Sequence, residues 1–131
     1  MRARDHDAPA GAGAEFGLAH GLVGIGEGPG EKAARMVRRF AELPDGTFVW
    51  TRTADGAYHL GRISGPWGRA NSPAARAVGI RHVRPATWLD RPFGEDAVPA
   101  AVAATFARGG RNFQRTHSES AERRTSELWE T

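Results

Sequence analysis

Two neighbouring stretches of the chain, residues 47–53 and 57–64, are rich in β-branched and aromatic side chains. Only Ala54-Asp55-Gly56 separates them, and Asp-Gly between two such stretches is typical of a tight β-turn. Side chains alternate between the two faces of a strand, which places Phe48 and Leu60 in the expected core. The sequence therefore predicts a β-hairpin here, and the remaining elements must pack around it.

Outside the hairpin, hydrophobic periodicity and turn signals divide the chain into further elements. From Glu31 to Ala41, apolar side chains recur at helical spacing while arginines occupy the other side, and Leu43-Pro44-Asp45-Gly46 is expected to end this helix. The other predicted elements are a first strand around 2–6, a loop over 8–14, a long loop over 65–77, a strand over 80–89, a short helix over 98–106 closed by Gly109-Gly110, and a last strand over 112–117.

The chain has 131 residues, the length of one ordinary domain. We expect residues 1–117 to form this domain and residues 118–131 to form a polar tail, which is either disordered or helical. Strands dominate the pattern, and helices fill the gaps between them. The predicted fold class is α+β, a small curved β-barrel of about five or six strands with two or three packed helices.

Alternate glycines from Gly24 to Gly30 precede the predicted helix, as they do in some loops that bind phosphate. The Gly-Lys-Ser/Thr ending of a P-loop is missing, because Glu31-Lys32-Ala33 follows the last glycine. The even spacing of the glycines also rules out the G-x-G-x-x-G pattern of dinucleotide-binding folds. Two interpretations remain: a tight turn from strand to helix, or glycines that let a flat ligand approach the backbone.

Catalytic and metal-binding patterns are poorly represented in the sequence. There is no cysteine, so neither a disulfide nor a thiolate metal site can form. The five histidines are dispersed along the chain and fit surface or hydrogen-bonding roles better than metal ligation. Lys32 is the only lysine, and no Gly-x-Ser-x-Gly sequence is present. We therefore expect a protein that is not an enzyme and that needs no metal or cofactor.

The net charge of the chain is only +3, but its basic residues are unevenly placed. No acidic residue occurs between Asp55 and Asp90, and seventeen of the 18 basic residues are arginine. Arginine suits bidentate contacts with phosphates and base edges, although an excess of Arg, Ala and Gly also follows from GC-rich coding. The acid-free window predicts a positive surface. Its arginines are Arg62, Arg69, Arg76, Arg81 and Arg84.

Trp67 is surrounded by glycine and proline and lies outside any regular strand pattern. Its indole either plugs the end of the barrel or stacks on a ligand. The flanking Arg62 and Arg69 favour the second role, because stacking within a cationic rim is how unpaired bases are held. Trp50 and Trp88 lie in predicted strands, which favours the core over ligand contact for both.

Several segments follow one another in a recognisable order. Gly21-Leu-Val-Gly-Ile-Gly26 precedes the basic helix, and Gly46-Thr-Phe-Val-Trp, Tyr58-His-Leu-Gly-Arg-Ile-Ser-Gly65 and Arg81-His-Val-Arg-Pro-Ala-Thr-Trp-Leu89 follow it. In this order, over about residues 20–117, the chain resembles the PUA-like superfamily, which includes EVE and YTH domains. More narrowly, it is similar to the N-terminal domain of Mrr-type modification-dependent endonucleases and to small actinobacterial YTH-like proteins that read 5-methylcytosine in DNA.

The resemblance implies a curved β-barrel in which a flipped, modified base is held in an aromatic-walled pocket. Such pockets lie between the segment matching 24–28 and the loop that here contains Trp67. Relatives often have tryptophan after the Gly-Ile-Gly step, where this chain has Glu27. A carboxylate there would accept a hydrogen bond from the exocyclic amine of cytosine, which favours cytosine over thymine. The expected base-pocket residues are Trp67, Glu27, Phe16, Trp50, Gly24 and Gly26, and the five arginines of the acid-free window are expected on the nucleic-acid backbone.

The leading hypothesis is a non-catalytic reader of modified DNA that flips 5-methylcytosine into an aromatic cage. The alternatives are an RNA-binding module of the same fold, or a targeting subunit of a restriction or defence system whose nuclease is a separate chain. The apolar runs are short, and the first residues lack the order of a secretory signal. We therefore expect a monomeric, cytoplasmic protein without membrane contact, whose partner is methylated DNA or, in the alternative, RNA.

Overall fold

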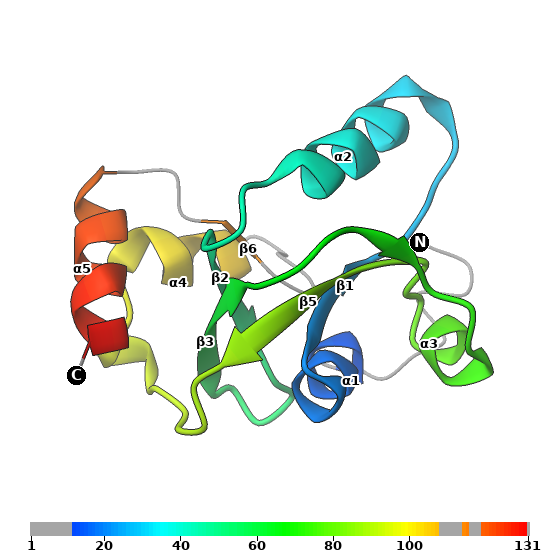
Figure 1. Cartoon of the computed structure of the whole chain (residues 1–131). Coiled ribbons are helices and arrows are strands. Elements are labelled where there is room, and N and C mark those ends of the chain that lie inside the picture. Colours follow the sequence, from blue (N-terminus) through cyan, green and yellow to red (C-terminus); the bar gives the residue numbers. More distant parts are fainter. Residues whose placement is uncertain (1–11, 108–113, 116–118, 131) are drawn as a thin grey trace.

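The computed structural model describes residues 12–107, 114–115 and 119–130 (Figure 1). No helix in these ranges is long and apolar enough to cross a membrane. In chain order the elements are α1 (Ala12–His20), β1 (Leu22–Ile25), α2 (Gly30–Glu42), β2 (Phe48–Arg52), β3 (Tyr58–Ile63), β4 (Gly68–Arg69), α3 (Pro73–Ala77), β5 (His82–Trp88), the 3-10 turn η2 (Glu95–Ala97), α4 (Ala100–Ala107), β6 (Gln114–Arg115) and α5 (Glu119–Glu130).

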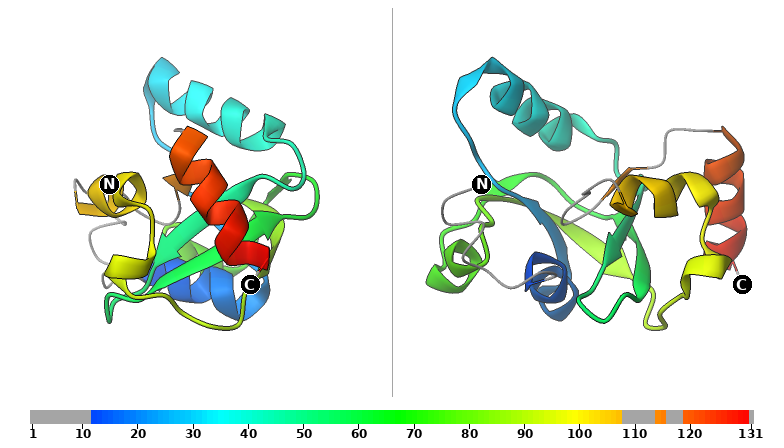
Figure 2. Two further views of the ribbon diagram at one scale, coloured as in Figure 1. Left: turned by 90° about the vertical axis from the view of Figure 1, so that its left-hand side faces the viewer. Right: turned by 180° about the vertical axis from the view of Figure 1, so that it is seen from behind.

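A six-stranded antiparallel sheet forms the centre of the molecule, in the order β1-β5-β3-β2-β6, with β4 paired to β5. The sheet curls into a half-barrel, with α1 and α2 on opposite sides of it and α4 and α5 beside the β2–β3 hairpin (Figures 1 and 2). The predicted fold class, an α+β fold with a small curved barrel and packed helices, is confirmed. The described residues form five α-helices, where two or three were expected.

The predicted hairpin forms as β2 and β3, in a register that pairs Arg52 with Tyr58. Gly56 adopts a φ of +90° in the turn, a conformation that favours glycine. The carboxylate of Asp55 accepts a hydrogen bond from the backbone N–H of Ala57 at 3.1 Å, which closes the turn. Turn chemistry and strand alternation therefore specify this hairpin locally, and the structure confirms it.

Both faces of the hairpin are buried, each against different helices. On one face Trp50 lies directly opposite Leu60. This face contributes to a cluster with α4 and α5 whose buried members are Trp50, Tyr58, Leu60, Phe93, Val98, Val102, Phe106 and Leu128. The other face, which we call the α2 face of the sheet, packs under the C-terminal part of α2, and its cluster contains Val23, Phe40, Val49, Ile63 and Ala86.

The chain makes a bulge between β3 and β4. Ile63 pairs with Ala86 of β5, and Gly68 pairs with Val83 of the same strand. The four residues 64–67 therefore lie opposite only the two residues between Val83 and Ala86, so the chain carries two extra residues here. Such bulges project side chains away from the regular sheet. Trp67 occupies the last position of this bulge, directly before β4.

The segment expected to be a polar tail forms α5, an amphipathic helix that packs on the first core cluster. Ala121, Thr125 and Leu128 are buried, and the Oγ1 of Thr125 accepts a hydrogen bond from the Nε1 of Trp50 at 3.1 Å. Thr125 is fully buried, so this bond satisfies an indole N–H that has no access to water. The described part of the expected tail is therefore helical, which was one of the two states left open, and it shares a core cluster with the hairpin.

Two predicted loops contain regular structure. The prediction of a loop over 8–14 is wrong from Ala12 onward, because helix α1 begins at that residue. The long loop over 65–77 is interrupted by β4 and by α3, whose first turn is capped by the hydroxyl of Ser72. The strand predicted around 2–6, the closing glycines at 109–110 and most of the strand predicted over 112–117 lie outside the described residues, which include only β6 of that last strand.

The Trp50–Thr125 bond allows a direct test of the contribution of α5 to stability. Thr125→Val keeps the shape of the side chain but leaves the buried indole N–H without an acceptor. We expect it to lower the free energy of unfolding by about 1–3 kcal/mol in urea denaturation. Thr105→Val is the matched control, because among the described residues the hydroxyl of Thr105 bonds within its own helix, to the carbonyl of Ala101. Equal stability of the two variants would contradict the role of the bond.

Candidate nucleic-acid interface

Trp67 is one of two large apolar side chains that are exposed among the described residues, with 42% of its surface accessible. Its indole Nε1 donates a hydrogen bond to the Nδ1 of His82 at 3.1 Å. The two ring planes lie at 26° to each other, and their centroids are 5.8 Å apart. The indole and the imidazole are therefore close to parallel and are joined through their ring nitrogens.

His82 begins β5, where it pairs with Ile25 on one side and with Arg69 on the other. Its side chain is only 3% exposed, whereas the indole bonded to it is open to solvent. An indole N–H can only donate, so Nδ1 must carry a lone pair, and the proton of the neutral ring lies on Nε2. Burial lowers the pKa of His82, although the nearby carboxylate of Glu27 opposes this effect. His82 is therefore held neutral, as its bond to Trp67 requires.

The carboxylate of Glu27 completes the group. Its Oε1 accepts a hydrogen bond from the Nη1 of Arg69 at 3.1 Å, and it lies 3.5 Å from the Nε2 of His82. The bond from Arg69 is the largest cause of the lowered pKa of Glu27. At 3.5 Å the contact with His82 is too long for a good hydrogen bond, so the buried Nε2 has no short partner within the described chain. We call Trp67, His82, Glu27 and Arg69 the Trp67 platform.

The glycines before α2 connect a strand to a helix, which was one of the two interpretations left open. Gly24 is a buried strand residue, and a Cβ atom at this position would meet the Cγ2 of Ile80 at 2.7 Å. The prediction that Gly24 lines a base pocket is therefore wrong, because Gly24 is buried and Ile80 fills the space beside it. Gly26 lies in the connection that carries Glu27, and Gly30 begins α2 with a φ of +90°.

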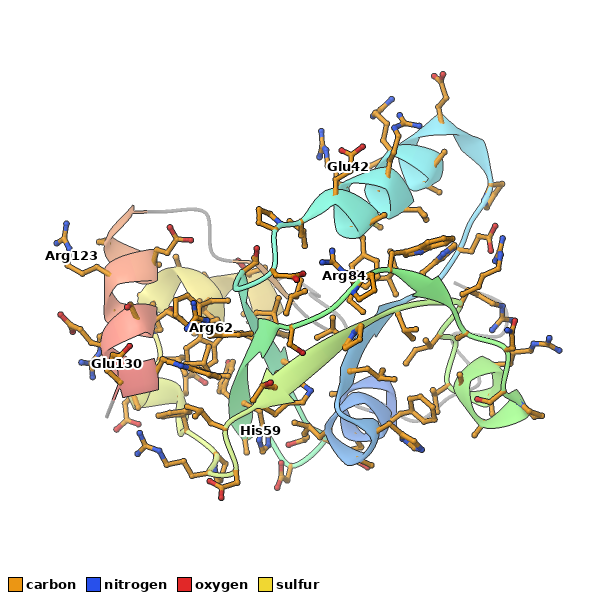
Figure 3. The ribbon with its side chains drawn as sticks, in the orientation of Figure 1. Glu42, His59, Arg62, Arg84, Arg123 and Glu130 are labelled. Carbon is orange, nitrogen blue, oxygen red and sulfur yellow. The ribbon has the colours of Figure 1, made fainter. Side chains whose placement is uncertain are left out.

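Arg84 is not a surface arginine, and the prediction that it contacts phosphate is wrong. Its side chain is 3% exposed and lies beneath α2 (Figure 3). The Nε donates to the carbonyl of Gly65 at 2.7 Å, and Nη1 donates to the carbonyls of Phe40 and Ala41 at 2.9 and 3.3 Å. Nη2 forms an ion pair with Asp45 at 3.0 Å. The guanidinium thus connects two segments, the end of α2 and the bulge, to strand β5.

Arg62 also has an internal role. Strand alternation places it on the same face as Leu60, toward α5, rather than on the α2 face (Figure 3). Its guanidinium lies over the rings of Phe48 and Trp129, at 4.8 and 5.5 Å, and its Nε donates to the carbonyl of Gly46. The expectation that Arg62 rims Trp67 is therefore wrong, since its cation is used in packing.

The other two aromatic candidates for the pocket lie elsewhere. Trp50 is fully buried in the core cluster under α5, as its position in the hairpin favoured. Phe16 belongs to α1, where its ring stacks on His20 at 4.1 Å, and α1 covers the side of the sheet opposite to α2 (Figure 1). Neither residue belongs to the Trp67 platform. Trp88 is half-buried against the second cluster, and its indole bonds to the carbonyl of Leu22.

Three of the five predicted backbone arginines remain near the surface at the β4–α3 end of the molecule. Arg69 and Arg76 are exposed, and Arg81 is half-buried. The Nη1 of Arg81 donates to its neighbouring carbonyl, and Arg69 pairs with Glu27. These three positions of the predicted positive surface lie at the end of the molecule that also carries Trp67.

The sequence reasoning missed His82 as a site residue, although a signal was present. In the predicted strand over 80–89, His82 and Arg84 alternate in step with Ala86 and Trp88, and Trp88 was expected in the core. Residues at even positions of this strand therefore share the buried α2 face. The same alternation could have shown that Arg84 points inward.

Removing the guanidinium of Arg84 should destabilise the protein strongly, because several buried carbonyls lose their donor at once. We expect Arg84→Ala to lower the free energy of unfolding by at least about 3 kcal/mol. Arg76→Ala is the matched control, and as an exposed substitution it should change stability by no more than about 0.5 kcal/mol. Urea denaturation measures both values, and similar stability of the two variants would refute the structural role of Arg84.

The buried neutral state of His82 predicts a pH dependence of stability. Because its pKa is lowered on folding, the unfolded chain binds the proton more readily. The contribution of His82 to the free energy of unfolding is thus fully present above the ordinary histidine pKa of about 6.5. It is lost as the pH falls through the lower pKa that His82 has in the folded protein. Burial lowers the pKa of His59 too, with the same sign. We expect His82→Gln and His59→Gln each to flatten the pH profile of unfolding, and an unchanged profile in His82→Gln would contradict this account.

Comparison of the chain with protein-family models, with curated proteins and with solved structures finds no match. The functional argument therefore depends on the fold and on the geometry of the Trp67 platform. The resemblance to PUA-like domains remains a prediction from the sequence.

Proposed function

We propose that the protein is a non-catalytic reader of modified DNA that stacks a flipped 5-methylcytosine on Trp67. The observation that carries this proposal is an exposed indole whose N–H is already bonded to a buried histidine. With its polar atom occupied inside the protein, the indole offers a ligand only its ring face. A ring face binds other flat rings, and stacking of one base on an aromatic side chain contributes about 1–3 kcal/mol.

The environment of Trp67 supports a preorganised contact. The hydrogen bond to His82 fixes the orientation of the indole, and the bulge that carries Trp67 is fixed through the bond from Arg84 to Gly65. An exposed aromatic ring that is already ordered loses little side-chain entropy when a ligand binds. The platform is therefore better suited to stacking than a freely rotating surface tryptophan would be.

The carboxylate of Glu27 supports cytosine as the base. Glu27 is held beside the platform by Arg69, and among the described residues only its Oε1 is engaged. The remaining oxygen is free to accept a hydrogen bond from an exocyclic amine, which cytosine has and thymine lacks. Support for the 5-methyl modification comes from the sequence resemblance over residues 20–117. Contacts with phosphates are assigned to Arg69, Arg76 and Arg81.

Substitution of Trp67 provides the direct test. Trp67→Ala should lose roughly 5- to 150-fold in affinity for a duplex with 5-methylcytosine, corresponding to the stacking energy of one base. Trp67→Phe is the matched control, because it keeps a flat ring without the N–H, and it should retain most of the preference for the methylated duplex. Fluorescence anisotropy with methylated, hydroxymethylated and plain duplexes measures the affinities, and circular dichroism verifies the fold.

Two results would overturn the proposal. One is equal affinity of the wild-type protein for methylated and plain duplexes at every salt concentration. The other is a Trp67→Ala variant that folds and still prefers the methylated duplex as strongly as the wild type. Tighter binding of RNA oligonucleotides in direct competition would assign the platform to RNA instead.

A further inference from the structure

We propose that the outward, cationic side of α2 is a second contact surface, which binds the phosphate backbone of duplex DNA and lies on the same side of the sheet as the Trp67 platform. This inference rests on the proposed function for its choice of nucleic acid as the partner. It replaces the contacts that Arg62 and Arg84 were expected to supply, since both of these side chains are used inside the protein.

The charges of α2 are concentrated on one side of the helix. At 3.6 residues per turn, its four basic residues fall within about a third of the circumference. All four are exposed, and no ion pair joins any of them to an acid within the described ranges. Glu31 and Glu42 lie at the two ends of the same side. The basic residues are Lys32, Arg35, Arg38 and Arg39.

The orientation of this cationic side is fixed by the C-terminal part of α2. Phe40 is 3% exposed and packs on the α2 face of the sheet. The guanidinium of Arg84 binds the carbonyls of Phe40 and Ala41 from below. The apolar side of the helix therefore faces the protein, and the basic side faces solvent.

The helix and the Trp67 platform lie over the same face of the sheet. His82 and Arg84 are two positions apart on β5, so their side chains project from the same face. Arg84 binds α2, while His82 binds Trp67. α2 and the platform thus lie on the same side of the sheet, with the basic side of α2 turned away from the sheet, and α3 with Arg76 lies at the end of the molecule away from α5 (Figure 1).

The dimensions and composition of α2 fit duplex DNA better than a membrane surface. From Lys32 to Arg39 the helix rises about 10 Å, which is the axial length of about three base pairs. A helix that lies on a membrane needs its apolar side free to enter the lipid. Here Phe40 is buried and Val37 is half-buried, and Met36 is the one large apolar side chain of α2 that is exposed.

The test uses two double variants of the full chain with identical changes of charge. Arg35→Gln with Arg39→Gln removes two charges from α2, and Arg123→Gln with Arg124→Gln removes two from α5, at the opposite end of the molecule from α3 (Figures 1 and 3). Anisotropy is measured with short methylated and plain duplexes over about 50–200 mM salt. Anionic vesicles of phosphatidylserine and phosphatidylcholine form a third arm, and circular dichroism verifies that both variants are folded.

We expect the α2 variant to lose roughly tenfold or more in affinity for both duplexes at about 0.1 M salt, with a salt slope smaller by about 1.8. Its preference for the methylated duplex should equal that of the wild type, and the α5 variant should bind as the wild type does.

Equal duplex binding by the two variants would overturn the inference, even if methylated and plain duplexes are still distinguished and the proposed function stands. Conversely, the α2 variant could show the smaller salt slope of duplex binding while the wild type shows no preference for the methylated duplex. This result would support the inference and overturn the proposed function. Vesicle binding that depends on α2, with duplex binding that does not, would assign this surface to membranes and overturn the inference.

Discussion

The guanidinium of Arg84 connects the parts of the molecule on which the remaining structure depends. Arg84 lies on β5 and bonds to the last turn of α2, to the loop residue Asp45 and to the carbonyl of Gly65 in the bulge. It thereby connects these three segments to β5. The last turn of α2 and the bulge offer backbone carbonyls that need a donor, Asp45 offers its carboxylate, and a planar fork of five donors can serve several such acceptors at once. A buried arginine is stable here because it is surrounded by acceptors and one carboxylate.

The position of Trp67 follows from this connection. The bulge places the indole next to the first residue of β5, and the bond from Arg84 keeps the bulge close to the sheet. His82 then fixes the ring through Nδ1, and Glu27 and Arg69 complete the platform. The candidate site is thus built from three separate parts of the chain: β5 holds the bulge and Trp67 through Arg84 and His82, and Arg69 of β4 holds Glu27.

Local pattern was sufficient to predict much of the fold. The hairpin, the strand β5 and the helix α2 all follow from periodicity and turn residues, because their specification is contained within short windows. The start of α1 at Ala12 was missed, since a run of alanine and glycine has too few side chains to show a period. The packing of α5 was missed as well, because its partner Trp50 lies 75 residues away in the sequence.

The site was predicted less well than the fold, for a related reason. Trp67 and Glu27 were named, but the bond between Glu27 and Arg69 spans 42 residues and depends on the complete sheet. Arg62 and Arg84 were misassigned because composition shows that a charge is present but not whether it is paired inside. Alternation within the strands contained that information, since both arginines share a face with apolar neighbours.

The bulge at residues 64–67 has a consequence for how this surface can diversify. On either side of it the ladder pairs Ile63 with Ala86 and Gly68 with Val83, and the bulge itself is bonded to β5 through the N–H of Ser64 and the carbonyl of Gly65. The side chain at position 67 takes no part in these backbone bonds, so it can be exchanged while both flanking registers are kept. The sheet and the side chain that the bulge presents to solvent are thus specified by different residues.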